Sequence, residues 1–422
     1  MSFSSNEFTY YAYDLLTGNP LGSIPMRGVS FSSVLNGTGQ LSGTVDLTDP
    51  RVQTTNPLGL TIPNRTLIAV DYLGALVWGG VVLPRKRAMT TDAGSQSFRL
   101  GVTCSELWSY FASRVQATDY SAPPTSGFGA MSLWTATPWD ANLIACQVIQ
   151  DALGVSHGNL LGGMGLLLNG SAPSGSAPVA PSGDWVAINY PLTTCQTIET
   201  IVSQLAQLGL GVGFDFGVDL AYSQGPGSPP VATINISYPR RGRTFAQNNL
   251  IADATTARAY EFPEDGSQTA NQVYEIGGSS AISVNQNITP LDQGYPLWER
   301  VFSRAQAQSA NIIALLVQIG RSDLALYSYA PTVPTLTLGV NDPNVPLGSF
   351  TAGDDVLVEI PQYSDHTDAS GNRLPFDPGF PGGLRQEWRI VQWTCNVADS
   401  GDSTVQFTFN QPPATSALAP AL

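Results

Sequence analysis

Residues Thr66-Leu-Ile-Ala-Val-Asp71 and Ala75-Leu-Val-Trp-Gly-Gly-Val-Val-Leu83, separated by Tyr72-Leu-Gly74, decide the fold. Both runs are short, apolar and rich in β-branched or aromatic residues, and the glycine between them favours a tight turn. They predict an antiparallel β-hairpin with Trp78 on its core face. Short strands are expected along most of the chain, because 42 glycines and 31 prolines interrupt it too often for long helices.

Working outward, similar strands flank this hairpin. Phe8–Asp14 reads as a strand, and a second hairpin turns at Asn36-Gly37 between Val29–Leu35 and Gly39–Leu47. Ser97–Thr103 predicts a strand that runs into a short helix at Ser105–Arg114, capped by Ser105. Residues 1–115 are therefore expected to form an N-terminal antiparallel β-barrel domain, with a sandwich as the alternative.

Helical periodicity replaces strand periodicity over residues 116–245, which we interpret as an α/β insertion domain. One helix is predicted to be capped by Asp140 and to end at Gly154. A second helix is predicted to begin at the capping box Thr193-x-x-Gln196 and to end at Gly209. Strands are predicted at Leu210–Tyr222 and Val231–Tyr238, and a surface loop at Gly170–Gly183.

The last third divides into a connecting domain, residues 246–334, and a C-terminal β-barrel domain, residues 335–422. The connecting domain includes a longer helix centred on Asn311–Gln318. In the C-terminal domain the segment Asp399–Asp402 is predicted to turn a hairpin. Its four predicted strands are Thr335–Leu338, Asp355–Ile360, Glu387–Trp393 and Thr404–Phe409. The predicted fold class is β-rich α+β, with two small antiparallel β-barrel domains and an α/β insertion.

Net charge, hydropathy and cysteine content restrict the classes of function that the chain could have. A net charge of −14 would repel a phosphate backbone, so no stable nucleic-acid binding is expected. No apolar run approaches the roughly 20 residues of a transmembrane helix, and no signal peptide is recognisable, so we expect a soluble chain. Cys104, Cys146, Cys195 and Cys395 lie far apart and are expected to be buried free thiols.

Catalytic motifs are weak. Gly154-Val-Ser-His-Gly158 matches the nucleophile elbow, and Asp365-His366 could complete a triad, but a predicted helix precedes the serine where an elbow needs a strand. A helix C-cap is the favoured interpretation. Carboxylates that could pair for glycoside hydrolysis are Asp215, Asp219, Glu264, Asp265, Asp354 and Asp355. Since Gly353-Asp-Asp355 is more simply a turn into a strand, no catalytic residue is predicted and no enzyme is expected.

Binding motifs are equally weak. The glycines of Gly209–Gly213 follow a predicted helix, whereas a phosphate loop opens one. The basic clusters Arg85-Lys-Arg87 and Arg240-Arg-Gly-Arg243 are interpreted as solvated turns. Two histidines far apart give a metal centre little to build on, so neither a metal nor a cofactor is predicted.

Both ends of the chain resemble a known family. Val45–Pro50, Arg65–Asp71, Leu76–Val81 and the Gly101–Arg114 step, together with Pro346–Val358 and Trp388–Gln392, resemble minor tail and tail-hub proteins of long-tailed actinobacteriophages. The resemblance implies a fold related to the baseplate hub of contractile tails. It also implies a structural role at the virion tail tip.

The implied partners follow from that family. They are a homotrimer of this chain, the distal tail protein or tail tube ring, the tape measure protein, and other minor tail proteins or fibres, with DNA only in transit. The alternative is a tail-tip protein that binds or hydrolyses host cell-wall carbohydrate or esters, using its 8 Trp and 15 Tyr to stack on sugars.

Overall fold

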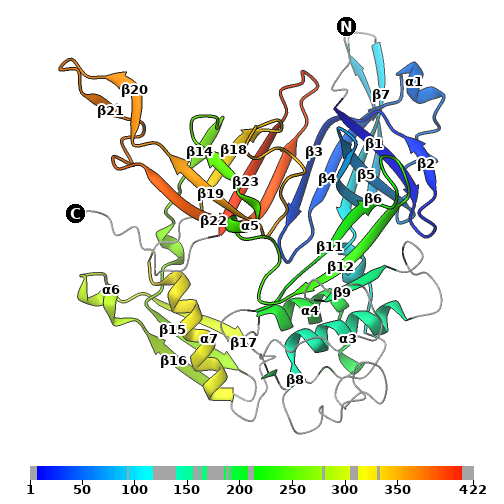
Figure 1. The fold of residues 1–422 in the computed structure, drawn as a ribbon. Helices are drawn as coiled ribbons and strands as arrows, with labels where there is room; N and C mark the ends of the chain where they lie inside the picture. Colours follow the sequence, from blue (N-terminus) through cyan, green and yellow to red (C-terminus); the bar gives the residue numbers. More distant parts are fainter. Residues whose placement is uncertain are drawn as a thin grey trace.

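The computed structural model describes residues 7–92, 95–116, 139–154, 160, 164–168, 185–186, 190, 192–207, 213–277, 281–304, 312–329 and 333–410. Strands from both ends of the chain dominate it, as the sequence predicts (Figure 1). Within these ranges, no helix combines the length and the apolar character that crossing a membrane requires.

One 13-stranded sheet runs through the molecule in the order β14-β18-β23-β22-β3-β4-β7-β6-β5-β1-β2, with β19 paired to β22 and β13 paired to β19. Its strands are β1 (Phe8–Asp14), β2 (Pro20–Ser23), β3 (Arg27–Val34), β4 (Gln40–Asp46), β5 (Thr66–Tyr72), β6 (Ala75–Asp92), β7 (Ser95–Glu106), β13 (Ile251–Asp253), β14 (Ala259–Glu261), β18 (Thr335–Gly339), β19 (Asp355–Ile360), β22 (Leu384–Asn396) and β23 (Thr404–Asn410). The predicted hairpins at Asn36-Gly37, at Leu73-Gly74 and at Asp399–Asp402 are confirmed.

The two terminal units share this sheet, and within the described residues the expected pair of closed barrels is not found. Strand β22 pairs antiparallel with β3, from Gln392 opposite Val34 to Asn396 opposite Ser30. A single hydrophobic core includes Phe31 of β3 and Trp393 of β22, whose rings meet edge to face at 5.8 Å. Among the described strands, pairing closes no barrel. Joining two exposed edges satisfies their backbone groups, which an isolated unit would leave open.

Strand β5 is the layer between two cores. All seven of its residues are buried, although a half-buried strand would alternate. Ile68 and Val70 face the core of the large sheet, whereas Leu67 and Ala69 face a second core. The second core contains α3 (Ala141–Leu153), α4 (Ile198–Gln207) and the sheet β11-β12-β9, formed by β9 (Gly165–Leu168), β11 (Asp215–Tyr222) and β12 (Pro230–Ser237). The insertion therefore covers the outer face of the N-terminal strands.

Some of the predictions for individual helices in the N-terminal unit and the insertion are confirmed, and others are wrong. Asp140 caps α3, accepting from Asn142 N at 3.3 Å, and Gly154 is the C-cap, both as predicted. The capping box at Thr193 is wrong: a 3₁₀ turn, Leu192–Thr194, precedes α4, and the Thr200 amide donates to the Thr197 hydroxyl at 3.2 Å. The helix expected at Ser105–Arg114 shortens to α2 (Ser109–Ala112), because β7 continues to Glu106 to pair with β6 and β4.

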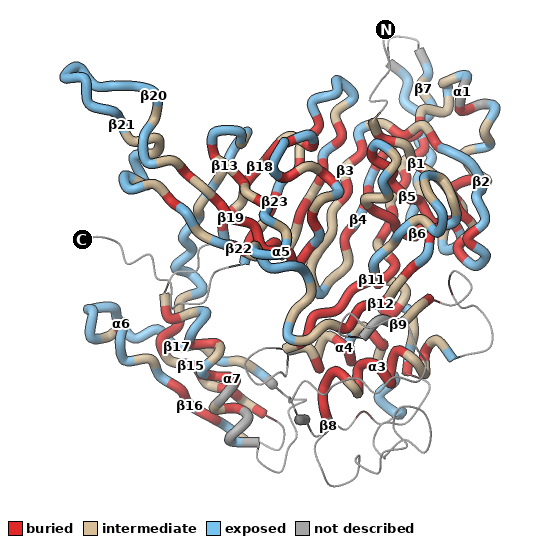
Figure 2. The backbone as a smooth tube through the Cα atoms, viewed as in Figure 1, coloured by how far each residue is buried: buried red, intermediate tan, exposed pale blue. Residues whose placement is uncertain are grey.

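The part of the chain between residues 272 and 327 forms a small separate layer. Strands β15 (Gln272–Gly277), β16 (Ile282–Gln286) and β17 (Glu299–Arg304) form a sheet on which α7 (Ile312–Tyr327) packs. The remaining elements are α1 (Pro50–Gln53), β8 (Trp139–Asp140), β10 (Trp185–Val186), α5 (Phe245–Asn248), the 3₁₀ turn Gly266–Gln268, α6 (Ile288–Asp292), β20 (Tyr363–Thr367) and β21 (Arg373–Pro375). Figure 2 shows burial concentrated in the sheets and along α3, while the β20–β21 arm and the outer end of β7 are exposed. The surface loop predicted at 170–183 lies outside the described residues.

Candidate functional site: an arginine–carboxylate junction

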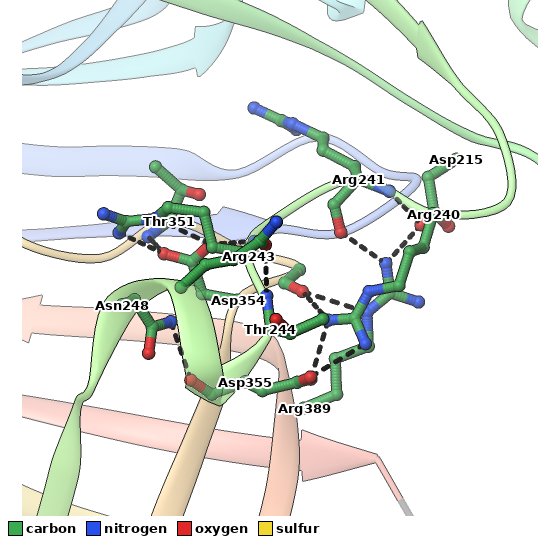
Figure 3. A network of polar contacts seen from close by, with 12 residues as sticks. Asp215, Arg240, Arg241, Arg243, Thr244, Asn248, Thr351, Asp354, Asp355 and Arg389 are labelled. Carbon is green, nitrogen blue, oxygen red and sulfur yellow. Dashed lines mark hydrogen bonds and ion pairs between the residues drawn. The ribbon is translucent and has the colours of Figure 1, made fainter. Parts of the chain in front are cut away.

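The segment 239–244 leaves the insertion after β12 and crosses to the C-terminal strands. The sequence predicted solvated turns for Arg240, Arg241 and Arg243, and that interpretation is wrong. Each guanidinium meets an aspartate from another element, and Arg389 of β22 joins them. Figure 3 shows the contacts of Asp215, Asp354 and Asp355. We call these four arginines, with Asp215, Asp219, Asp354 and Asp355, the junction.

Arg240 is held at the first residue of β19. Its two terminal nitrogens donate to the two carboxylate oxygens of Asp355 at 2.8 and 2.7 Å, and one also donates to the Gly353 carbonyl at 2.8 Å. The Asp355 side chain is 13% exposed and that of Arg240 28%. A two-pronged, partly buried pair of this kind fixes orientation as well as distance.

Asp354 is the most enclosed carboxylate of the junction, with no exposed side-chain surface. It accepts from the Arg243 amide at 2.6 Å, from the Arg243 guanidinium at 2.5 Å and from the Thr351 amide at 3.0 Å. The hydrogen bond from Arg243 to this carboxylate raises the pKa of Arg243 above its ordinary value. Gly242 lies between the pairs at φ +89°, and a Cβ there would come within 2.1 Å of the Gly353 carbonyl carbon. Only glycine permits this approach.

Asp215 connects three parts of the chain. It pairs with Arg389 of β22, accepts from the Arg241 amide at 2.7 Å, and accepts from the Asn36 side chain at 2.7 Å. The Asn36 side-chain oxygen accepts in turn from the Phe216 amide at 2.8 Å. Asn36 adopts φ +55°, which asparagine tolerates in a hairpin turn. The N-terminal hairpin, the insertion and the C-terminal sheet thus meet at one carboxylate.

The junction balances its charges, since four arginines face four aspartates. Arg241 also pairs with Asp219, whose second oxygen accepts from Asn235. A hollow of about 430 Å³ opens beside the junction and is lined by Asn36, Ala206, Gly213, Phe214, Asp215, Pro239, Arg240 and Arg389. With every carboxylate held by a guanidinium, the arrangement is suited to joining elements.

Glu106 lies close to the junction and was not singled out from the sequence. It accepts from the Gly39 amide at 2.7 Å. Burial raises its pKa to about 7, against a smaller lowering by that hydrogen bond. Glu106 ends a strand like many surface glutamates, so only the tertiary contacts distinguish it.

The remaining predicted residues do not converge. Ser156, His157 and Gly158 of the elbow motif lie outside the described residues, and His366 is exposed on β20. Glu264 and Asp265 are exposed just after β14, and Asp265 caps the 3₁₀ turn Gly266–Gln268 by accepting from the Ser267 amide. No group of three or more potential metal-ligating side chains gathers in the described part of the chain.

The first basic cluster is not a turn either. Arg85, Lys86 and Arg87 lie within β6, and Arg85 donates to the carbonyl oxygens of Leu58 at 2.6 Å and Thr61 at 2.9 Å. The cluster therefore belongs to a strand, with one of its three cations committed to holding a loop.

The cysteines are free, as predicted, but they are not all buried. Cys104, Cys146 and Cys395 are buried, and Cys195 is exposed. Burial raises the pKa of Cys104 and of Cys395 to about 12. Cys195 departs from the prediction because it lies in the turn before α4, where φ is +46°.

No protein-family model and no curated protein matches the sequence. Solved structures do match. The 43 kDa tail protein of prophage MuSo2 from Shewanella oneidensis is 12% identical, with a TM-score of 0.55 over 96% of this chain and 98% of that one. The tail protein of Neisseria meningitidis MC58 is 10% identical, with a TM-score of 0.53 over 96% and 97%. The chain shares the fold of these tail proteins. Identities this low carry the fold alone.

Proposed function

We propose that the chain is a structural subunit of a phage tail. The observation that carries the proposal is the likeness to two tail proteins over nearly the full length of all three chains. A likeness of this extent covers the sheet, the insertion and the small layer together. An isolated domain reused in another context would cover only one of them.

The junction supports a structural role. It fastens three regions of the chain through paired charges, and the β3–β22 pairing fastens the two terminal units a second time. A subunit that must keep its shape between neighbouring rings needs such internal fastening. We propose that it has no catalytic activity of its own.

The finer proposal places the subunit in the virion, at the tail tip, as a hub. There it would link the tail tube or distal tail ring to tip proteins, as a homotrimer surrounding part of the DNA channel. A net charge of −14 suits a conduit through which DNA passes without binding. Light scattering on the purified chain tests the trimer, which would weigh about 134 kDa, three times 44.6 kDa.

Disrupting the gene in its phage tests the tail role itself. Electron microscopy of the lysate should then show particles with incomplete tails, and supply of the wild-type chain from a plasmid should restore them. A tagged copy detected by gold labelling should lie at the tail tip. Normal, infectious particles without the chain would overturn the proposal.

The carbohydrate alternative relies on exposed tryptophan. Among tryptophans whose side chains are described, Trp78, Trp108, Trp388 and Trp393 are buried, and only Trp298 is exposed. Most of the described indoles therefore serve the cores and are unavailable for stacking on sugars. Binding on a glycan array, or a cleared band on peptidoglycan zymography, would favour the alternative instead.

A further inference from the structure

Strands β6 and β7 pair as a two-stranded ribbon over residues 85–91 and 96–102, and the tip of this ribbon extends past the core. The register runs from Arg85 opposite Val102 to Thr91 opposite Gln96. Strand β4 accompanies β7 only as far as Arg99, so the tip of the ribbon has no further strand beside it. Figure 2 shows this end of β7 exposed.

The row of apolar residues that faces the core on β7 continues into the exposed part of the ribbon. Val102, Leu100 and Phe98 alternate along one face of β7, and their exposed fractions are 1%, 0% and 41%. Phe98 lies directly opposite Met89, which is 56% exposed. An apolar cross-strand pair normally covers itself against a core. Here the pair lies beyond the core, as it does on a surface that binds another protein.

The ribbon is also basic within an acidic chain. Lys86 and Arg99 lie on the face opposite Phe98, and Arg87 lies beside Met89. All three are exposed, and within the described residues none forms an ion pair. A partner with both carboxylates and apolar surface would complement these residues.

A second copy of the chain offers such carboxylates. Strand β14 is one end of the large sheet, and Glu261, Glu264 and Asp265 are exposed in and just after it. The nearest cation in sequence, Arg258, already pairs with Asp402. Between β14 and β7 the sheet has five strands, a separation of roughly 29 Å along the sheet. The ribbon and this acidic end of one copy are thus placed to bind different neighbours.

We propose that the β6–β7 ribbon of one copy docks on the acidic end of the next copy, residues 261–265, in a head-to-tail contact. This inference rests on the proposed function and names the contact between its subunits. A head-to-tail contact uses two different surfaces, so it closes into a ring when the rotation between copies permits. The exposed Met89–Phe98 pair favours a protein partner over nucleic acid.

Charge reversal in the full-length chain tests the contact. Lys86→Glu with Arg99→Glu reverses the ribbon, and Glu261→Lys with Glu264→Lys reverses the acidic end. Sedimentation velocity at about 50 mM and about 500 mM salt should show a wild-type oligomer that weakens at high salt. Each double variant should weaken self-association at least about tenfold. The fourfold variant, which exchanges both signs, should regain most of it.

Matched controls separate this contact from other effects. Arg321→Glu reverses an exposed cation on α7, outside the ribbon and outside residues 261–265, and should leave association unchanged. Recovery in the fourfold variant also shows that neither pair of changes simply prevents folding. A wild-type chain that stays monomeric, or an oligomer indifferent to all three variants, would overturn the inference. So would a monomer that binds duplex DNA through the ribbon.

The inference and the proposed function fail separately. If the ribbon variants enter complete tails normally while gene disruption abolishes tails, the chain is a tail subunit and the head-to-tail contact is wrong. If gene disruption leaves tails intact, the proposed function is wrong whatever the association of the purified chain.

Discussion

Replacing Asp354 with alanine should destabilise the protein by about 3 kcal/mol. The substitution leaves the amides of Arg243 and Thr351 without their acceptor, at 2.6 and 3.0 Å in the wild type. Each of these partly buried amides costs about 1 kcal/mol when it loses its acceptor. The lost ion pair adds about 1 kcal/mol, a reduced value because Arg243 is 48% exposed and can be rehydrated.

Urea unfolding followed by tryptophan fluorescence measures this change, with Asp402→Ala as the matched control. Asp402 also pairs with an arginine, Arg258, but the two side chains are 64% and 54% exposed. An exposed pair contributes little, so the control should shift the free energy of unfolding by less than about 0.5 kcal/mol. If Asp354→Ala and Asp402→Ala give equal shifts, the junction does not stabilise the fold in the way we argue.

Three further results are expected. Asn36→Gly keeps the positive φ and removes both side-chain hydrogen bonds to β11. Urea unfolding should show that the free energy of unfolding falls by about 2 kcal/mol. A fall of less than about 0.5 kcal/mol would contradict the linking role of Asn36. Burial raises the pKa of Glu106 from 4.5 to about 7, so folding favours its protonated form. The free energy of unfolding of the wild type should therefore fall by up to about 3 kcal/mol from about pH 5 to pH 8, relative to that of Glu106→Gln. Parallel pH profiles of the two proteins would refute this. A thiol reagent should label one cysteine of the native protein quickly and Cys195→Ser should abolish that reaction, while fast labelling of a second thiol would contradict the burial of the other three.

Local features of the fold could be predicted because their signals lie close together in the sequence. The turn at Asn36-Gly37 and the cap at Asp140 depend on residues within a few positions of each other. The capping box at Thr193 shows the limit of such signals. Thr193 and Thr197 both precede plausible helical residues, and only packing of Ile198 into the second core selects Thr197.

The larger features that the sequence did not predict depend on distant partners. The β3–β22 pairing joins residues more than 350 positions apart, and strand patterns alone do not specify which edges meet. The junction could not be predicted from the sequence for the same reason. Arg240 and Arg243 look like a turn cluster because their aspartates lie more than 110 residues away. Nothing in the local spacing indicates that their charges are already paired.

The two long-range links act together, and this bears on how the chain would work in a tail. The β3–β22 ladder alone would leave the insertion free to swing about its connections to the sheet. Asp215 prevents this, because it is held by Asn36 from one terminal unit and by Arg389 from the other. Since β5 is buried on both faces, the insertion also cannot lift away without exposing Leu67 and Ala69. The ribbon and the acidic end are therefore held at a fixed separation on one rigid sheet. Copies joined through them would each add the same rotation, and a ring closes when these rotations sum to one full turn.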